Sequence, residues 1–303
     1  METLIMRITY LHQYFNTPEM AGGTRSYEMA RRLVSRGHQV NMVTSWRVND
    51  GRRGWFETEE AGIRVHWLPV PYSNHMSYPQ RIRAFLRFAW GAARRAASLP
   101  ADVVFATSTP LTIALPAVYA ARRRKVPMVF EVRDLWPELP IAVGAIKHPA
   151  LIALARWLER FAYRHSAQIV SLSPGMKEGV IQAGYPAERV HVIPNSADLE
   201  LFTVSADKAK AFRWKFEWLQ DRPLVVYAGT LGRINGVDYL ARLAAAVQPL
   251  NPDIRFLVIG DGAEQEKVLT TAQQMGVYGR NFFSTTRTLQ PDEPKNLIKI
   301  FRL

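Results

Sequence analysis

Short apolar runs alternate with segments of helical periodicity along most of this chain. A continuous apolar run suits a strand of a parallel sheet, whereas apolar residues three and four positions apart suit a helix packed on that sheet. The runs lie at residues 5–12, 40–44, 103–107, 128–132, 168–172, 190–193, 224–228 and 254–259. Their alternation with helices predicts an α/β fold of two Rossmann-like, doubly wound parallel-sheet domains.

The pattern weakens over residues 195–205, which we interpret as a connector. The predicted domains are therefore residues 1–197 and 198–303. Ligands of doubly wound sheets bind beyond the carboxyl ends of the strands, so we expect a cleft where the two domains face each other.

Several weaker patterns complete this prediction. Residues 48–60 are polar and predict a loop, whereas residues 63–67 alternate between apolar and polar and predict a strand. A last short strand is expected near Phe282. The run at 224–228 predicts a strand buried on both faces. Ser173 and Pro174 predict the cap and the first turn of a helix.

Residues 79–98 form a two-sided helical pattern. The apolar side is expected to face the core and holds Ile82, Phe85, Leu86, Ala89, Ala93 and Ala96. The other side is basic, with Trp90 at its border, and holds Arg81, Arg83, Arg87, Arg94 and Arg95. Two interpretations stay open: a solvated face of an ordinary helix, or a face beside an anionic leaflet, which residues 122–125 would extend.

Glycines lie in the loops that follow two of the predicted strands. Gly229 and Gly232 follow the run at 224–228, and a helical pattern begins at Gly236. Glycine lets the backbone approach a phosphate, and the first amides of a helix point toward it. Gly22 and Gly23 lie similarly after the first strand. Because tight turns need glycine for geometry alone, these loops favour phosphate binding and packing about equally.

Composition narrows the possible classes of function. The 303 residues, 48% of them hydrophobic, are enough for two moderate cores. The absence of cysteine excludes disulfides, thiolate metal sites and a cysteine nucleophile. We expect neither a signal peptide nor a membrane-spanning helix, and we predict a cytoplasmic protein.

A net charge of +13 suggests an anionic partner. Nine basic residues and one acid lie between Tyr78 and Lys125. Neither a DNA- or RNA-binding motif nor interleaved aromatic residues accompany them, so no nucleic-acid partner is predicted.

Five segments together resemble retaining glycosyltransferases of the GT-B class, group-4 family. They are LHQYFNTPEMAGGTRSYEMARRL, EVRDLWPE, VIPNSADLELF, YAGTLGRINGVDYL and FLVIGDGAEQEKV. The chain is most similar to enzymes that build bacterial O-antigen, capsule or exopolysaccharide units. The resemblance implies sugar transfer from a nucleotide-diphosphate sugar to a lipid-linked or polysaccharide acceptor. It places the enzyme at the inner face of the cytoplasmic membrane, peripherally bound, without a cofactor or metal.

The resemblance assigns the acceptor to the first domain and the donor to the second. The acceptor-side residues would be Gly22, Gly23, Thr24 and Arg25. The donor-binding residues would be Gly229, Thr230, Gly232, Arg233, Asn235, Gly236 and Asp261. Thr230 and Asn235 stand where relatives carry an arginine and a lysine that pair with the pyrophosphate. We hypothesise that Arg233, in the same loop, supplies the positive charge that these positions lack. Asp261 suits a helix cap equally well.

The segment RDLWPE supplies the catalytic hypotheses. Arg133 stands where many relatives have a histidine near the reacting sugar, and it would stabilise charge on the departing phosphate or the acceptor, with Asp134 or Glu138 orienting it. Arginine stays protonated, so we expect the leaving phosphate to take the acceptor proton, as is thought for this class. A structural salt bridge is the alternative role of Arg133 and Asp134. His12 is expected to be a packed residue.

The resemblance ends after Phe283. Relatives continue with a glutamate pair of spacing E-x7-E that holds the donor sugar, and no such pair follows here. We therefore expect an incomplete second domain, from a frameshifted or prematurely ended gene, with weak donor binding and reduced or absent activity. A short form completed by a partner chain stays open.

Two other functions remain as alternatives to a glycosyltransferase. A sugar-nucleotide epimerase of the same architecture would turn over a nucleotide sugar without an acceptor. A catalytically silent binding or scaffolding domain would bind vesicles without binding a nucleotide. Donor, acceptor, linkage and oligomeric state depend on details that sequence patterns do not reveal.

Overall fold

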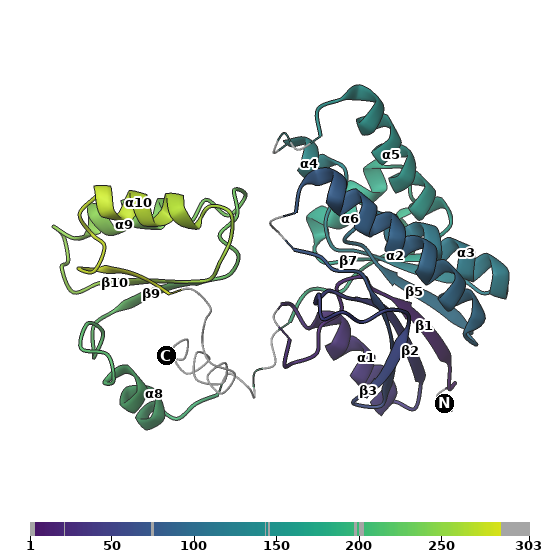
Figure 1. Cartoon of the computed structure of the whole chain (residues 1–303), viewed down its shortest axis with the longest axis horizontal. Coiled ribbons are helices and arrows are strands. Elements are labelled where there is room, and N and C mark those ends of the chain that lie inside the picture. The colour runs from purple at the N-terminus through teal and green to yellow at the C-terminus, as the bar shows by residue number, and fades with distance from the viewer. Residues whose placement is uncertain are drawn as a thin grey trace. The chain divides into compact units, whose positions relative to one another are not determined.

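A computed structural model describes residues 4–20, 22–73, 76–142, 144, 146–196, 199 and 203–285 (Figure 1). The contacts within the chain divide it into two compact units, Met1–Asn195 and Ser196–Leu303.

The first unit is built on an eight-stranded sheet of order β3-β4-β2-β1-β5-β6-β7-β8. Neighbouring strands run parallel, except that β3 is antiparallel to β4. The strand order reverses between β1 and β5, which makes their carboxyl ends the topological switch point where such sheets bind ligands. The strands are β1 (Arg7–Leu11), β2 (Gln39–Trp46), β3 (Phe56–Glu60), β4 (Ile63–Pro69), β5 (Val103–Thr107), β6 (Met128–Val132), β7 (Gln168–Ser171) and β8 (Val190–Val192).

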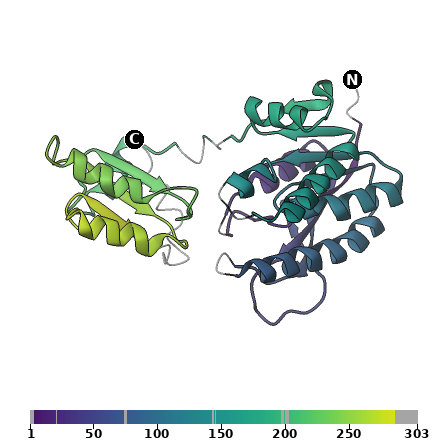
Figure 2. The same ribbon diagram turned by 90° about the horizontal axis from the view of Figure 1, so that it is seen from above.

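Helices cover both faces of this sheet (Figure 2). Alternate residues of the strands face opposite cores: Tyr10 and Met42 pack with α1, whereas Leu11 and Val43 pack on the other side. The doubly wound arrangement predicted for this part of the chain is therefore present. One face carries α1 (Arg25–Ser35), and the other carries α2 (Tyr78–Ser98), α3 (Ala114–Arg124), α5 (Pro149–Arg164) and α6 (Pro174–Gln182). The short α4 (Glu138–Ala142) follows β6, and 3-10 turns lie at η1 (Leu111–Ile113) and η2 (Ala187–Arg189).

The second unit holds a parallel sheet of order β11-β10-β9. The strands are β9 (Leu224–Ala228), β10 (Arg255–Ile259) and β11 (Phe282–Thr285). Helices α9 (Asp238–Val247) and α10 (Gln265–Gln274) cover one face, and α8 (Ala206–Arg213) with Trp218 covers the other. The prediction that β9 is buried on both faces was wrong. Val225 is 39% exposed, because β9 lies at the edge of the sheet formed by the described residues.

The loop predicted over residues 48–60 was also partly wrong, since Phe56–Glu60 is strand β3. Phe56 stacks on Trp67 with ring centroids 6.2 Å apart, and the Trp67 indole donates a hydrogen bond of 2.9 Å to Thr58. The charged residues of β3 masked this strand in the sequence, because an edge strand does not need a continuous apolar run.

The predicted orientation of α2 was wrong in part. Ala89 and Ala96 are buried as expected, but Ile82 and Leu86 are 55% and 53% exposed. Phe88, which the prediction left out, is fully buried together with Ala92. Small residues let α2 approach the sheet closely, so the helix turns its alanines and Phe88 inward and leaves its bulkier aliphatic side chains outside.

Within the described residues, the helices are all too short or too polar to cross a membrane.

Candidate functional site

The carboxyl ends of β5 and β6 are joined through the residues that follow them. Ser108 accepts a hydrogen bond of 2.9 Å from the backbone amide of Arg133, and Thr109 donates one of 2.8 Å to the Asp134 carboxylate. Asp134 is therefore oriented by Thr109. Ser108 and Thr109 were not among the predicted site residues, although they come immediately after the apolar run at 103–107.

The first glycine loop lies beside Arg133. Gly22 has a φ of +133°, and a Cβ there would lie 2.5 Å from Nδ2 of Asn16. Asn16 donates from the same nitrogen to the carbonyl of Gly23 at 3.1 Å. A Cβ on Gly23 would lie 3.9 Å from Nη2 of Arg133. The structure thus brings the predicted acceptor-side loop next to the predicted catalytic arginine.

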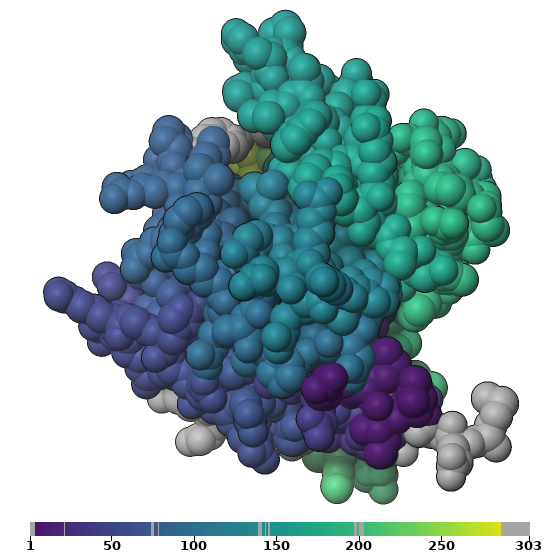
Figure 3. Space-filling view, turned by 90° about the vertical axis from the view of Figure 1, so that its right-hand side faces the viewer, coloured from purple at the N-terminus to yellow at the C-terminus, as the bar shows by residue number. Residues whose placement is uncertain are grey.

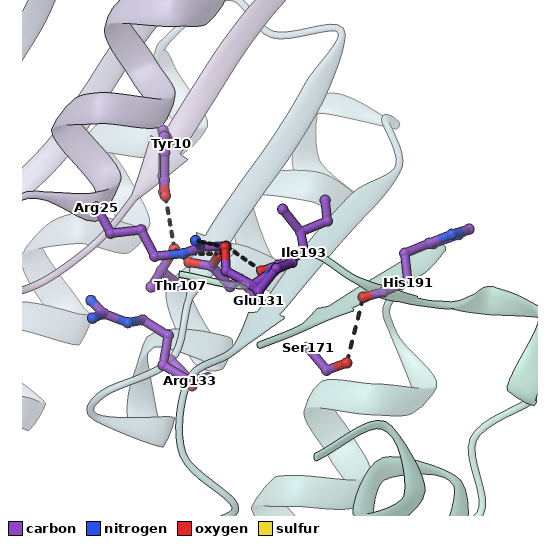
Figure 4. A network of polar contacts seen from close by, with 10 residues as sticks. Tyr10, Arg25, Thr107, Glu131, Arg133, Ser171, His191 and Ile193 are labelled. Carbon is purple, nitrogen blue, oxygen red and sulfur yellow. Dashed lines mark hydrogen bonds and ion pairs between the residues drawn. The ribbon is translucent and has the colours of Figure 1, made fainter. Parts of the chain in front are cut away.

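Arg25 is engaged with protein groups rather than directed at open space (Figure 4). Its guanidinium donates to the buried carboxylate of Glu131 at 2.9 Å and to the carbonyls of Ile193 and Pro194, each at 2.9 Å. Glu131 also accepts from Thr107, which in turn contacts the hydroxyl of Tyr10. This network ties α1 to the centre of the sheet and to the chain after β8. Thr24, at the N-cap of α1, makes no side-chain capping bond.

Two buried polar residues follow β1. His12 is 2% exposed, and its Nδ1 lies 2.7 Å from the Ser26 hydroxyl. Burial, followed by the charges of Arg133 and Arg47, lowers the pKa of His12 to about 3, so the ring is neutral near pH 7. Gln13 is 1% exposed, and both polar atoms of its amide lack a partner among the described residues. Because an unpaired buried amide is costly, Gln13 is a group for which a bound hydroxyl or water would supply a partner.

Glu138 lies apart from these groups. It begins α4 and borders a small pocket with Leu135, Glu159 and Gly179. Burial and the neighbouring Glu138 charge raise the pKa of Glu159 to about 7. No hydrogen bond or ion pair among the described residues joins Glu138 to Arg133 or Asp134.

In the second unit, two glycine loops lie against each other at the carboxyl ends of β9 and β10. A Cβ on Gly260 would lie 1.8 Å from the carbonyl oxygen of Gly229, and one on Gly262 would lie 2.4 Å from that of Leu231. Leu231 donates its amide to the carbonyl of Asp261 at 3.0 Å. Bare backbone is therefore required at this contact.

The side chains predicted to bind the donor all lie around these two loops. Asp261 accepts from the amide of Gly262 at 2.6 Å, which is a local turn contact. The Arg233 side chain is exposed and has no partner among the described residues. The backbone N–H of Asn235 donates a hydrogen bond of 2.9 Å to the carbonyl of Gly232, and Gly236 has a φ of +56°. The amides of Thr230 and Gly232 donate to no acceptor within the described residues.

Among the described residues, no group of three or more histidine or acidic side chains is arranged to hold a metal ion.

The glycosyl transferase 4-like domain model matches residues 21–196, more than half of the chain. The chain belongs to this family. It is 23% identical over 303 residues to a protein described as colanic acid biosynthesis glycosyl transferase WcaI from Escherichia coli K12, an alignment covering 93% of this chain and 71% of that protein. The family, the enzyme class and the α/β architecture predicted from the sequence are thereby confirmed.

Solved structures agree on the fold. The glycosyltransferase WaaG, described as involved in lipopolysaccharide biosynthesis, matches with a TM-score of 0.64 at 16% identity, over 97% of this chain and 72% of that chain. Anabaena Alr3699/HepE, solved in complex with UDP-glucose, matches with a TM-score of 0.65 at 17% identity, over 96% and 71% of the two chains. At these identities the likeness shows the fold alone.

Proposed function

We propose that this chain transfers a sugar from a nucleotide-diphosphate sugar to a lipid-linked or polysaccharide acceptor during synthesis of a bacterial surface glycan. The observation that carries the proposal is the position of Arg133 beside the Gly22–Gly23 loop and close to His12, at the carboxyl ends of the central strands of the first sheet. Family membership and the similarity to WcaI support the choice of reaction.

The donor diphosphate binds at the two glycine loops of the second unit. The unpaired amides of Thr230 and Gly232 are suitable donors to phosphate oxygens, and the exposed Arg233 adds positive charge within the same loop. HepE, whose fold is similar, holds UDP-glucose in its solved structure. Replacing Arg233 with alanine should weaken binding of the nucleotide about tenfold, since one charge-assisted contact is lost. Unchanged affinity would remove Arg233 from the site.

Arg133 stabilises negative charge as the sugar leaves its phosphate. Its guanidinium lies beside Gly23 and makes no hydrogen bond or ion pair within the described residues, so it is available to a substrate. Asp134 is held by Thr109 and lies next to it in the chain. The reaction retains the anomeric configuration, with the leaving phosphate accepting the proton of the acceptor hydroxyl, and it needs no metal. A rate that EDTA leaves unchanged would agree with this, and a rate that EDTA abolishes would contradict it.

We also propose a peripheral position at the inner face of the cytoplasmic membrane. Arg83, Arg87 and Arg94 on α2 are exposed, as are residues 122–125, which form the last turn and the C-cap of α3. Arg81 and Arg95, which the sequence placed on the same surface, are engaged elsewhere. Arg81 donates to the carbonyl of Met76, and Arg95 pairs with Glu57 and His66. Charge attraction to anionic lipids would bring the acceptor and the enzyme together.

Titration calorimetry of the purified chain with UDP, GDP and their sugar forms tests the donor. Saturable binding to one of these nucleotides supports the proposal and identifies the donor base. A radiolabelled sugar that moves from this nucleotide to a lipid extract completes the test. A folded chain that binds none of them would contradict the proposed activity.

A further inference from the structure

An open, mostly apolar groove lies on the first unit between α2 and α3. Its volume is about 1120 Å³. The apolar lining comes from both helices and includes Ile82, Leu86, Trp90, Leu115, Pro116 and Tyr119. Figure 3 views the unit from the side on which the blue surface of α2 adjoins the teal-blue surface of α3.

The groove exposes large apolar side chains that a folded chain ordinarily covers. Trp90 is 68% exposed and Tyr119 is 50% exposed, in addition to Ile82 and Leu86. They are contiguous rather than scattered, because α2 turns Phe88 and its alanines to the sheet. A contiguous apolar patch of this kind is typical of a binding surface.

Arginine is the charged residue that lines the groove. Arg83, Arg87 and Arg94 border it, and the described lining includes no carboxylate. Arg83 and Arg87 form no hydrogen bond or ion pair with another described residue, while Arg94 lies over the Trp90 ring with its guanidinium carbon 4.7 Å from the ring centroid. An apolar floor with unpaired guanidinium groups at its border complements a molecule with a hydrocarbon chain and a phosphate.

The topology connects this groove to the site. Helix α2 follows the carboxyl end of β4, and α3 follows the carboxyl end of β5 through η1. Both helices therefore begin at the edge of the sheet where Arg133 lies, and Arg83 and Arg87 lie in the amino-terminal half of α2. A phosphate held there would direct its glycan toward the switch point while its hydrocarbon chain lay along the two helices.

We propose that the α2–α3 groove binds the single hydrocarbon chain of a lipid phosphate that carries the acceptor glycan, with Arg83 and Arg87 at its phosphate and Arg94 over Trp90 farther along the groove. This inference rests on the proposed function, because it identifies the lipid-linked form of the acceptor. The apolar lining comes from two neighbouring helices, so a hydrocarbon chain that lies between them would contact both.

Calorimetric titration with decyl phosphate, kept below its critical micelle concentration, tests this proposal. We expect saturable binding of one molecule per chain, and we expect inorganic phosphate at the same concentration not to bind. Leu86→Glu and Trp90→Ala should each weaken binding at least tenfold while leaving the melting temperature unchanged, since both side chains are exposed in the free chain.

Two triple variants, each of which removes three positive charges, test the contribution of charge. Arg83→Gln, Arg87→Gln and Arg94→Gln together should weaken binding of decyl phosphate at least tenfold. The matched control changes Arg36, Arg53 and Arg64, which are exposed elsewhere on the first unit, to glutamine and should bind as the unmodified chain does.

Three results would overturn the proposal. One is equal binding of inorganic phosphate and decyl phosphate, which would leave no role for the apolar floor. Another is equal weakening in the two triple variants. The third is binding to anionic vesicles without binding to monomeric decyl phosphate, which would assign the surface to a bilayer. None of these measurements uses a nucleotide, so failure here and failure of donor binding are separate results.

Discussion

The loops that follow the parallel strands present different chemical groups in the two units of this chain. After β5 and β6, the first unit presents side chains: Arg133, Asp134 and the hydroxyl groups that hold them. After β9 and β10, the second unit presents backbone, where Gly229 and Gly260 leave no room for a Cβ. A side-chain site can vary its chemistry by substitution, whereas a backbone site binds a group common to many substrates. This contrast agrees with the proposal that the first unit binds the acceptor and the second unit the donor diphosphate.

Breaking the buried ion pair of the first unit should have the largest effect. Glu131→Gln leaves Arg25, whose side chain is 11% exposed, without its counter-ion, and we expect a loss of about 3 kcal/mol in the free energy of unfolding. The matched control is Glu28→Gln, which breaks more exposed pairs on α1 and should cost less than about 1 kcal/mol. Chemical denaturation measures both. Equal losses would mean that Glu131 does not hold the centre of the sheet.

Gly260→Ala tests whether backbone contact organises the second unit. The added methyl would lie 1.8 Å from the Gly229 carbonyl, so the two loops must separate. We expect a loss of about 2 kcal/mol in unfolding free energy. Gly279→Ala, at a φ of +75° with open space around it, should cost only about 1 kcal/mol. If the two variants lost the same stability, close contact between the loops would not be what requires glycine.

Glu159 should make stability depend on pH. Its folded-state pKa is raised to about 7, first by burial and then by Glu138, while Arg156 and Arg160 lower it and Tyr163 donates a hydrogen bond. The folded state holds this proton more tightly than the unfolded state, whose carboxyl group ionises near pH 4.5. Stability should therefore fall by on the order of 2 kcal/mol as the pH rises from 4.5 to about 7.

Glu159→Gln should remove this fall, whereas Glu178→Gln, an exposed change on α6, should keep it. Urea denaturation across this pH range makes the comparison. An identical pH profile for Glu159→Gln and the unmodified chain would contradict the assignment.

A helix cap gives the smallest effect. Ser173 accepts a hydrogen bond of 3.2 Å from the Met176 amide, as its position before Pro174 predicted. Ser173→Ala should lower the free energy of unfolding by about 1 kcal/mol. Ser205→Ala, at the N-cap of α8 where the side chain makes no capping bond, should cost less than half as much. The reverse order in thermal melts would refute the role of the cap.

Sequence patterns located most of the strands because the central strands of a parallel sheet need apolar residues on both faces. Met128–Val132 is an example. Strand β3 was not predicted, because an edge strand of the sheet tolerates charged residues such as Glu57, Glu59 and Glu60. The side of α2 that faces the sheet was also predicted incorrectly. Apolar residues extend around much of this helix, and the fit of Phe88 against the sheet decides which of them are buried.

The positions of Gly229 and Arg133 at strand ends were predictable, because each directly follows an apolar run. Contacts between distant residues were not predictable. Arg25 and Glu131 lie 106 residues apart, and the sequence indicated Arg25 only as a ligand group. The isolation of the Gln13 amide likewise depends on which groups the fold places around it.

Arg133→Ala, measured by both donor binding and steady-state transfer, tests the central claim that the first unit supplies the chemistry and the second holds the donor. We predict that the Kd for the nucleotide stays unchanged while kcat falls about 100-fold, because one charge-stabilising group is removed. Arg133→Lys should recover part of the rate. A parallel loss of nucleotide affinity, or an unchanged kcat, would contradict this division of labour.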